Sequence, residues 1–83
     1  MKQLILYSRS YCHLCHEMEQ ALRAQFDLSG VRLEVRDVDA DEQAVARWDE
    51  LVPVLLALQA DGQERELCHY FLDAAAVASW LQE

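Results

Sequence analysis

The fold is decided by one stretch of the chain, LILYSRSYCHLC at residues 4–15. Residues 4–7 form an apolar run of strand length, and apolar residues then recur at helical spacing over residues 18–26. Cys12 and Cys15 therefore fall where a strand passes into a helix. At a helix N-terminus, unpaired backbone N–H groups and the positive end of the helix dipole stabilise an anion. We expect a redox-active dithiol in which Cys12 is the nucleophile and ionises more readily than a free thiol.

The chain is long enough for one small domain, residues 1–83. Hydrophobic residues make up 53% of it, which predicts a packed core, and two glycines and one proline leave little room for flexible linkers. No apolar run approaches the roughly 20 residues that span a bilayer, and strand-like sequence follows Lys2 directly with no signal-peptide pattern. We therefore expect a cytoplasmic protein.

The formal net charge of −8 limits the classes of partner. Such a chain repels phosphate backbones and anionic lipid surfaces, so we expect no nucleic acid and no membrane among its partners. In the cytoplasm, glutathione and thioredoxin keep thiols reduced, and permanent structural disulfides are rare. A cytoplasmic Cys-x-x-Cys pair is therefore catalytic or metal-binding.

The first half of the chain predicts two helices separated by a strand. Helix one is expected from Cys12 to the neighbourhood of Gly30, where glycine supplies a left-handed cap. Alternating apolar and polar residues over 31–36 predict a strand with one buried face. Asp39 and Glu42 form the expected capping box of a short second helix. The inner face of that helix is predicted to carry Ala44, Val45, Trp48 and Leu51.

The second half predicts a hairpin followed by a helix. Residues 53–58 are almost continuously apolar, which is typical of a central strand, with Pro53 at its first position. A tight-turn signal, Asp61-Gly62, follows, and residues 64–68 can return antiparallel. Asp73 is the expected N-cap of a last helix. The inner face of this helix is predicted to carry Ala74, Val77, Trp80 and Leu81.

The order is thus strand, helix, strand, helix, strand, strand, helix, in an α/β chain whose first two strands are parallel. This order, with Cys-x-x-Cys after the first strand, resembles the glutaredoxins, the compact branch of the thioredoxin superfamily. Residues 7–15 are similar to the glutaredoxin active-site segment, in which a basic residue, here Arg9, stands three positions before the first cysteine. Val52-Pro53 resembles the family's cis-proline loop. The resemblance implies a thioredoxin/glutaredoxin-like fold, a four-stranded mixed sheet flanked by three helices.

The resemblance also implies roles for residues around the dithiol. It implies that Pro53 is cis and packs against the active-site disulfide, and that Val52 offers backbone groups to an extended substrate. In a glutathione complex of that type, Arg9 lies near one carboxylate and Asp73 near the free amine. The chain resembles small bacterial glutaredoxin-like proteins more than the glutathione-dependent type.

Three positions depart from the family pattern. The family usually has proline after its first cysteine and threonine two positions before the cis-proline, whereas His13 and Leu51 stand there. Residues 68–72 replace a Gly-Gly pair that lets backbone groups reach one glutathione carboxylate, and larger side chains would crowd that approach. We expect no bound cofactor, and we expect glutathione to be a poor co-substrate.

Four other side chains have alternative interpretations. His13 is either an exposed turn residue or a cation that favours the Cys12 thiolate. Tyr11 and Tyr70 either flank the disulfide as an apolar docking surface or cover the edge of the core. Cys68, at the end of a strand, is either a buried structural thiol or a third redox group.

The sequence predicts a thiol-disulfide oxidoreductase in which Cys12 attacks a substrate disulfide and Cys15 resolves the mixed disulfide. A disulfide-containing protein and a separate reductant are the expected partners, and we expect a monomer. The alternative is a non-enzymatic adaptor or metal-binding module on the same fold, whose thiols hold zinc or an iron–sulfur cluster. Cys68 and His69 would be the further zinc ligands, although their adjacency is a poor match to zinc-ribbon spacing.

Overall fold

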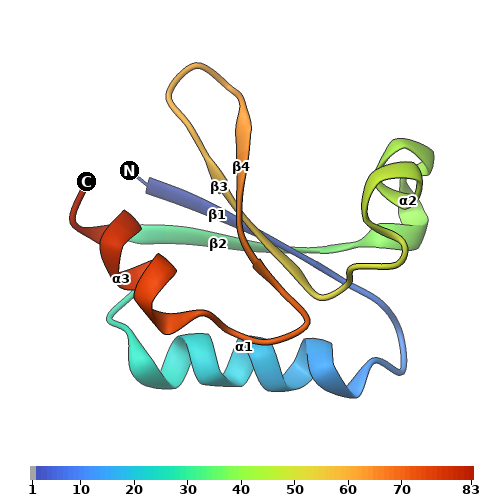
Figure 1. The fold of residues 1–83 in the computed structure, drawn as a ribbon, viewed down its shortest axis with the longest axis horizontal. Coiled ribbons are helices and arrows are strands. Elements are labelled where there is room, and N and C mark those ends of the chain that lie inside the picture. The colour runs from blue at the N-terminus through green and yellow to red at the C-terminus, as the bar shows by residue number, and fades with distance from the viewer. Residues whose placement is uncertain (1) are drawn as a thin grey trace.

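The computed structural model describes residues 2–83 as a four-stranded mixed sheet with helices on both faces (Figure 1). The strand order is β2-β1-β3-β4, with β1 parallel to β2 and antiparallel to β3, and with β3 antiparallel to β4. The elements in chain order are β1 (Lys2–Ser8), α1 (His13–Gln25), β2 (Val31–Asp37), the 3₁₀ turn η1 (Val38–Ala40), α2 (Glu42–Trp48), β3 (Val54–Leu58), β4 (Glu64–His69) and α3 (Ala74–Leu81). The predicted element order and fold class are confirmed. No helix in the described chain is long and apolar enough to cross a membrane.

The two central strands are apolar on both faces because each face is covered. Side chains alternate along a strand, so Leu4 and Leu6 of β1 point to one side and Ile5 and Tyr7 to the other. The first pair packs with residues of α1 and α3, and the second pair packs with residues of η1 and α2. The prediction that the strand after Pro53 is central is also confirmed, because β3 lies between β1 and β4.

Three local features that the sequence predicted are present: the turn at Gly62, the Asp73 helix cap and the cis bond before Pro53. Gly62 has φ +86°, a left-handed conformation that glycine adopts without strain, and its N–H donates to the Gln59 carbonyl in the turn between β3 and β4. Asp73 caps α3, since its side chain accepts the Ala76 N–H at 3.0 Å. The Val52–Pro53 peptide bond is cis, as the glutaredoxin resemblance implied.

The prediction that helix one continues to Gly30 is wrong. α1 ends at Gln25, and Phe26 is already extended, with φ −131°. The Asp27 side chain accepts the Ser29 N–H at 3.0 Å, an Asx turn that offers the backbone an alternative to the helix. Gly30 is not among the residues with positive φ and is therefore not a left-handed cap.

The predicted start and end of the second helix are also corrected. Its N-cap is Asp41, which accepts the Gln43 N–H at 2.9 Å, so Asp39 and Glu42 do not form a capping box. Asp39 instead lies in η1. α2 ends at Trp48, and Leu51 packs against the core from the connection to β3.

Two positions predicted to face the core are exposed. Ala74, at the first position of α3, is exposed, while Val77 and Trp80 of the same helix are buried. Val35 of β2 is 42% exposed because β2 is an edge strand, whose far end the helices do not cover completely.

Leu6 and Val35 are register partners on neighbouring strands and so provide a matched test of this core. Leu6 is fully buried, and Leu6→Ala should lower the free energy of unfolding by about 2–5 kcal/mol, because it leaves a cavity between the sheet and α1. Val35→Ala should lower it by less than about 1 kcal/mol. Urea denaturation followed by circular dichroism measures both; equal losses would contradict the burial of Leu6 between the sheet and α1.

Candidate active site

The two cysteines lie at the beginning of α1 and form a disulfide. Cys12 is the N-cap residue, and its Sγ accepts the Cys15 backbone N–H at 3.1 Å. The Cα atoms of Cys12 and Cys15 are 5.2 Å apart. Cys12 is half-buried, whereas Cys15 is only 4% exposed. A partner can therefore reach the first sulfur more easily than the second.

The chain enters α1 through a strained residue. Tyr11 has φ 60°, the left-handed region that side chains other than glycine rarely adopt, and its side chain is fully exposed. Tyr11 therefore does not cover the edge of the core, which was one of its two interpretations. Its ring is exposed to solvent directly beside the Cys12–Cys15 disulfide.

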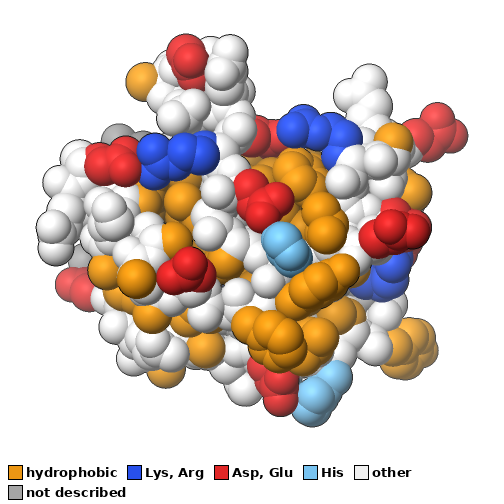
Figure 2. Space-filling view, viewed as in Figure 1, with side chains coloured by type: hydrophobic (Ala, Val, Ile, Leu, Met, Phe, Trp, Pro, Cys, Tyr) orange, Lys and Arg blue, Asp and Glu red, His pale blue; other side chains and the backbone are white. Residues whose placement is uncertain are grey.

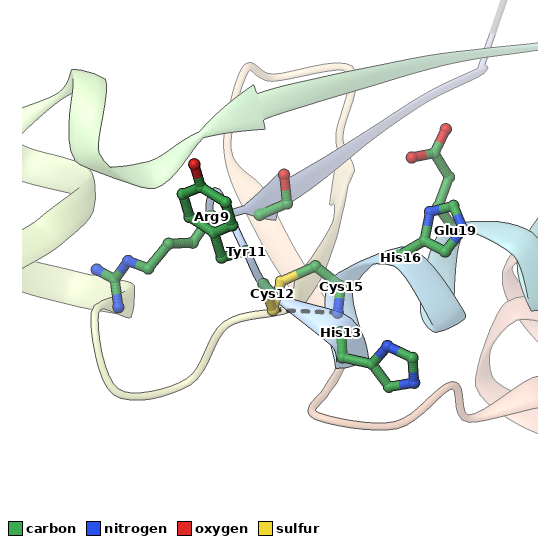
Figure 3. Close-up of a pocket in the computed structure, with 8 residues that line it drawn as sticks. Arg9, Tyr11, Cys12, His13, Cys15, His16 and Glu19 are labelled. Atoms are coloured by element: carbon green, nitrogen blue, oxygen red, sulfur yellow. Dashed lines mark hydrogen bonds between the residues drawn. A yellow bond between two sulfur atoms is a disulfide. The ribbon is translucent and has the colours of Figure 1, made fainter.

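Five residues singled out from the sequence line one open hollow of about 510 Å³: Arg9, Tyr11, Cys12, His13 and Cys15 (Figure 3). Ser8, His16 and Glu19 complete its lining. His13 is 85% exposed, and its Nε2 lies 3.1 Å from the Glu17 carboxylate, one helical turn further on. Val52, Pro53 and Asp73 are not part of this lining.

Arg9 points away from the disulfide (Figure 3). Its Nε and one terminal nitrogen donate to the two carboxylate oxygens of Asp39, at 2.9 and 3.0 Å. The same terminal nitrogen also donates to the Asp49 carboxylate. These hydrogen bonds raise the pKa of Arg9, and the guanidinium holds the pKa of Asp39 below its ordinary value. Arg9 thus ties the loop before Cys12 to η1 and to the end of α2.

The cis-proline loop is held by Tyr70. The Tyr70 N–H donates to the Pro53 carbonyl at 2.9 Å, and the Tyr70 hydroxyl donates to the Glu50 carbonyl at 2.5 Å. Tyr70 has φ 64°, so it is a second non-glycine residue in the left-handed region. Val52 lies between these anchors, before the β1–β3 ladder begins at Val54, and no backbone hydrogen bond within residues 2–83 involves it.

Cys68 does not take part in the disulfide. It is buried at the end of β4, packed with residues of α1 and α3, and burial raises the pKa of its thiol although the Asp73 backbone donates a hydrogen bond to it. Within residues 2–83, no three His, Cys, Asp or Glu side chains gather as metal ligands. The zinc set of Cys12, Cys15, Cys68 and His69 therefore does not assemble in this structure.

Sequence reasoning missed Asp39 and Asp49 as partners of Arg9. They lie 30 and 40 positions from it along the chain, so no local pattern connects the three residues. It also missed the double anchoring by Tyr70, because the sequence does not show which carbonyl groups a tyrosine in a loop can reach.

The mixed sheet, the helices on both faces and the disulfide at the start of α1 together define a protein of the thioredoxin fold. The chain belongs to the glutaredoxin-like domain family: the family model described as "Glutaredoxin-like domain (DUF836)" matches residues 3–82. A search of curated protein sequences found no match.

Solved structures are similar over nearly the whole chain. The NMR structure of protein Ne2328 from Nitrosomonas europaea is 38% identical, with a TM-score of 0.80 over 95% of this chain and 89% of that one. The X-ray structure of protein XcR50 from X. campestris is 27% identical, with a TM-score of 0.62 over 95% of each chain. The oxidised mitochondrial thioredoxin 3 of Saccharomyces cerevisiae shares the fold at 18% identity, with a TM-score of 0.65 over 98% of this chain and 76% of that one.

The ion pair between Arg9 and Asp39 predicts an acid-sensitive contribution to stability. Because Arg9 lowers the pKa of Asp39 below 3.8, this contribution is complete above the unfolded pKa and is lost as the pH falls through the lower folded pKa. Asp39→Asn should lower the free energy of unfolding at pH 7, by a small amount since the pair is exposed. That difference should shrink as the pH falls below about 4 and through the lowered pKa of Asp39.

Urea unfolding of both proteins over this pH range measures the effect. Glu50→Gln, which removes an exposed carboxylate after the end of α2 that is not among the described ion pairs, is the control. A difference between wild type and Asp39→Asn that persists undiminished at pH 2 would contradict the assignment.

Proposed function

We propose that the protein is a thiol-disulfide oxidoreductase. The observation that carries this proposal is the position of Cys12: its half-buried sulfur caps α1, accepts the Cys15 N–H and is already joined to a buried Cys15. The same amide and the helix dipole would stabilise a thiolate on the reduced Cys12, since both favour negative charge at a helix N-terminus.

The reaction would proceed in two exchanges that conserve atoms and electrons. The Cys12 thiolate attacks one sulfur of the substrate disulfide, a mixed disulfide forms, and the other substrate sulfur leaves as a thiolate. Cys15 then loses its proton and attacks the Cys12 sulfur, which releases the second substrate thiolate and forms the Cys12–Cys15 disulfide. The substrate gains two electrons. A dithiol reductant must then supply two electrons to reduce the Cys12–Cys15 disulfide again.

Protein disulfides are the proposed substrates. The hollow beside Cys12 is open, and the Val52 backbone next to the cis-proline has no internal hydrogen-bond partner among residues 2–83, so it can pair with an extended chain. A reducing compartment such as the cytoplasm, which we propose as the location, would supply the reductant. We also propose that the protein acts as a monomer.

The two cysteines should be separable by mutation. Cys15→Ser leaves the accessible thiol but no resolving thiol, so it should accumulate mixed disulfides with an oxidised protein substrate such as insulin. Cys12→Ser should accumulate none. Non-reducing electrophoresis with mass spectrometry detects the adducts, and Cys68→Ser is the control that should leave the wild-type pattern unchanged, because Cys68 is buried. If the Cys12→Ser variant formed adducts on Cys15, then Cys15 would be the nucleophile and Cys12 the resolving thiol.

Glutathione should be a poor co-substrate. Arg9 is bound to two carboxylates, Asp73 caps α3, and Tyr70 occupies the loop beside Pro53 in place of a small residue. We therefore expect slow turnover of a glutathione mixed disulfide in a glutathione-coupled assay. Reduction of insulin driven by dithiothreitol should be measurable under the same conditions.

The opposite pattern would contradict this expectation. Rapid turnover of the glutathione mixed disulfide, abolished by Arg9→Ala, would show that Arg9 leaves its two carboxylates to bind the tripeptide.

A further inference from the structure

Exposed hydrophobic side chains gather around the reactive disulfide. Four large hydrophobic side chains are exposed within residues 2–83, and three of them, Tyr11, Tyr70 and Phe71, lie in the two segments next to the site. Phe71 is 68% exposed. Figure 2 shows hydrophobic side chains gathered where the connection from β4 to α3 passes the beginning of α1. A surface of this kind marks an interaction site, because scattered exposed residues would be the ordinary arrangement.

One part of this surface is a shallow groove of about 150 Å³. Leu14 and Met18 of α1 form one wall, and Tyr70 and Phe71 form the other. The volume is below that of a site for a whole small-molecule ligand and suits one apolar side chain of a larger partner. Leu14 lies between Cys12 and Cys15 in the sequence, so a side chain in the groove would bring its own backbone close to the disulfide.

The rim of this surface is acidic. Glu17 lines the groove, and Glu66 binds His69, whose ring packs edge-on against Tyr70. Glu50 is exposed, and its backbone carbonyl accepts the Tyr70 hydroxyl; Asp39 and Asp49 share Arg9, which lines the hollow beside Cys12.

The cations of the chain do not balance these five carboxylates. Within residues 2–83, Arg9 is the only lysine or arginine that pairs with any of them, and the histidines His13 and His69 contact Glu17 and Glu66. Every other lysine and arginine pairs with an oxygen outside these five carboxylates: Lys2 with the Trp80 carbonyl, Arg23 with Glu19 of the hollow beside Cys12, Arg32 and Arg36 with Glu34, Arg47 with Glu64, and Arg65 with Glu83. The face that carries the Cys12 sulfur therefore has more carboxylates than lysine and arginine side chains.

We infer that this face docks a cationic, disulfide-bearing segment of a partner protein, with one apolar side chain in the groove and lysine or arginine residues against the acidic rim. The inference rests on the proposed disulfide exchange and adds the class of substrate. Opposite charges raise the rate of productive encounter and exclude acidic competitors. A second copy of this chain is disfavoured as occupant, because the net charge of −8 on each copy makes them repel.

Three small disulfides test the charge preference: cystamine, a dication; 2-hydroxyethyl disulfide, which is neutral; and 3,3′-dithiodipropionate, a dianion. The conversion of reduced to oxidised protein is followed by mass spectrometry after acid quenching, and each rate constant is divided by that of dithiothreitol with the same disulfide. At low salt, the normalised rate for cystamine should exceed that for the dianion by about tenfold or more. The ratio should approach one in 0.5 M NaCl, since salt screens exposed charges.

Variants on this face and away from it test whether its carboxylates cause the preference for a cationic disulfide. Glu17→Gln with Glu50→Gln should lower the cystamine-to-dianion ratio at least about twofold. Asp61→Asn is the matched control: it removes a carboxylate from the turn between β3 and β4, keeps the side-chain oxygen that accepts the Gln63 N–H, and should leave the ratio unchanged.

The groove is tested with a cyclic peptide that carries a disulfide, two lysines and one leucine. Phe71→Ser should slow reduction of this peptide but not of cystamine, whereas Val35→Ser, at an exposed position on the edge strand, should slow neither.

The outcomes separate the two proposals. If none of the disulfides is reduced, the oxidoreductase function fails and the docking inference fails with it. If 2-hydroxyethyl disulfide is reduced but cystamine and the dianion react at equal normalised rates, the function stands and the inference is overturned. A dimer in sedimentation that Phe71→Ser dissociates would assign the groove to a second copy and would also overturn it.

Discussion

The structure depends on the burial of β1 on both faces. A strand that is apolar on both faces needs a layer of helices on each face of the sheet. The connections between the strands must therefore place helices on both sides. α1 and α3 supply one layer and α2 the other. Because β1 leads directly into the crossover to α1, the end of β1 and the start of α1 are fixed relative to the core. The disulfide occupies that junction.

Two tyrosines hold backbone conformations that cost about 1–2 kcal/mol each for residues other than glycine. At Tyr70, hydrogen bonds to Pro53 and Glu50 offset the strain and fix the cis-proline loop beside β4. At Tyr11, the side chain is fully exposed and makes no hydrogen bond to the described residues. A strained residue without a compensating internal contact, next to the Cys12 sulfur, is more easily explained by what binds there than by folding.

The sequence predicted what depends on local spacing. The Cys-x-x-Cys pair, the apolar period of α1, the Asp73 cap and the hairpin after Asp61-Gly62 were all correct, since each is set by residues within a few positions of one another. The end of α1 was missed because an Asx turn at Asp27 competes with a glycine cap three residues later. Arg9 was taken as a candidate substrate contact, yet its partners are distant in the chain and become visible only when η1 and α2 fold against β1.

The binding of Arg9 by two carboxylates changes how the electrostatics of the site should be understood. From the sequence, an arginine three positions before Cys12 adds positive charge to the active site and favours an anionic substrate. In the structure, the same arginine is an internal tether, and the group of Arg9, Asp39 and Asp49 carries a net negative charge. Stabilisation of a Cys12 thiolate then falls to the helix N-terminus, whose amide contacts the sulfur directly. In the proposed exchange, the N-terminus of α1 favours the anionic nucleophile, and the acidic rim favours the proposed cationic partner.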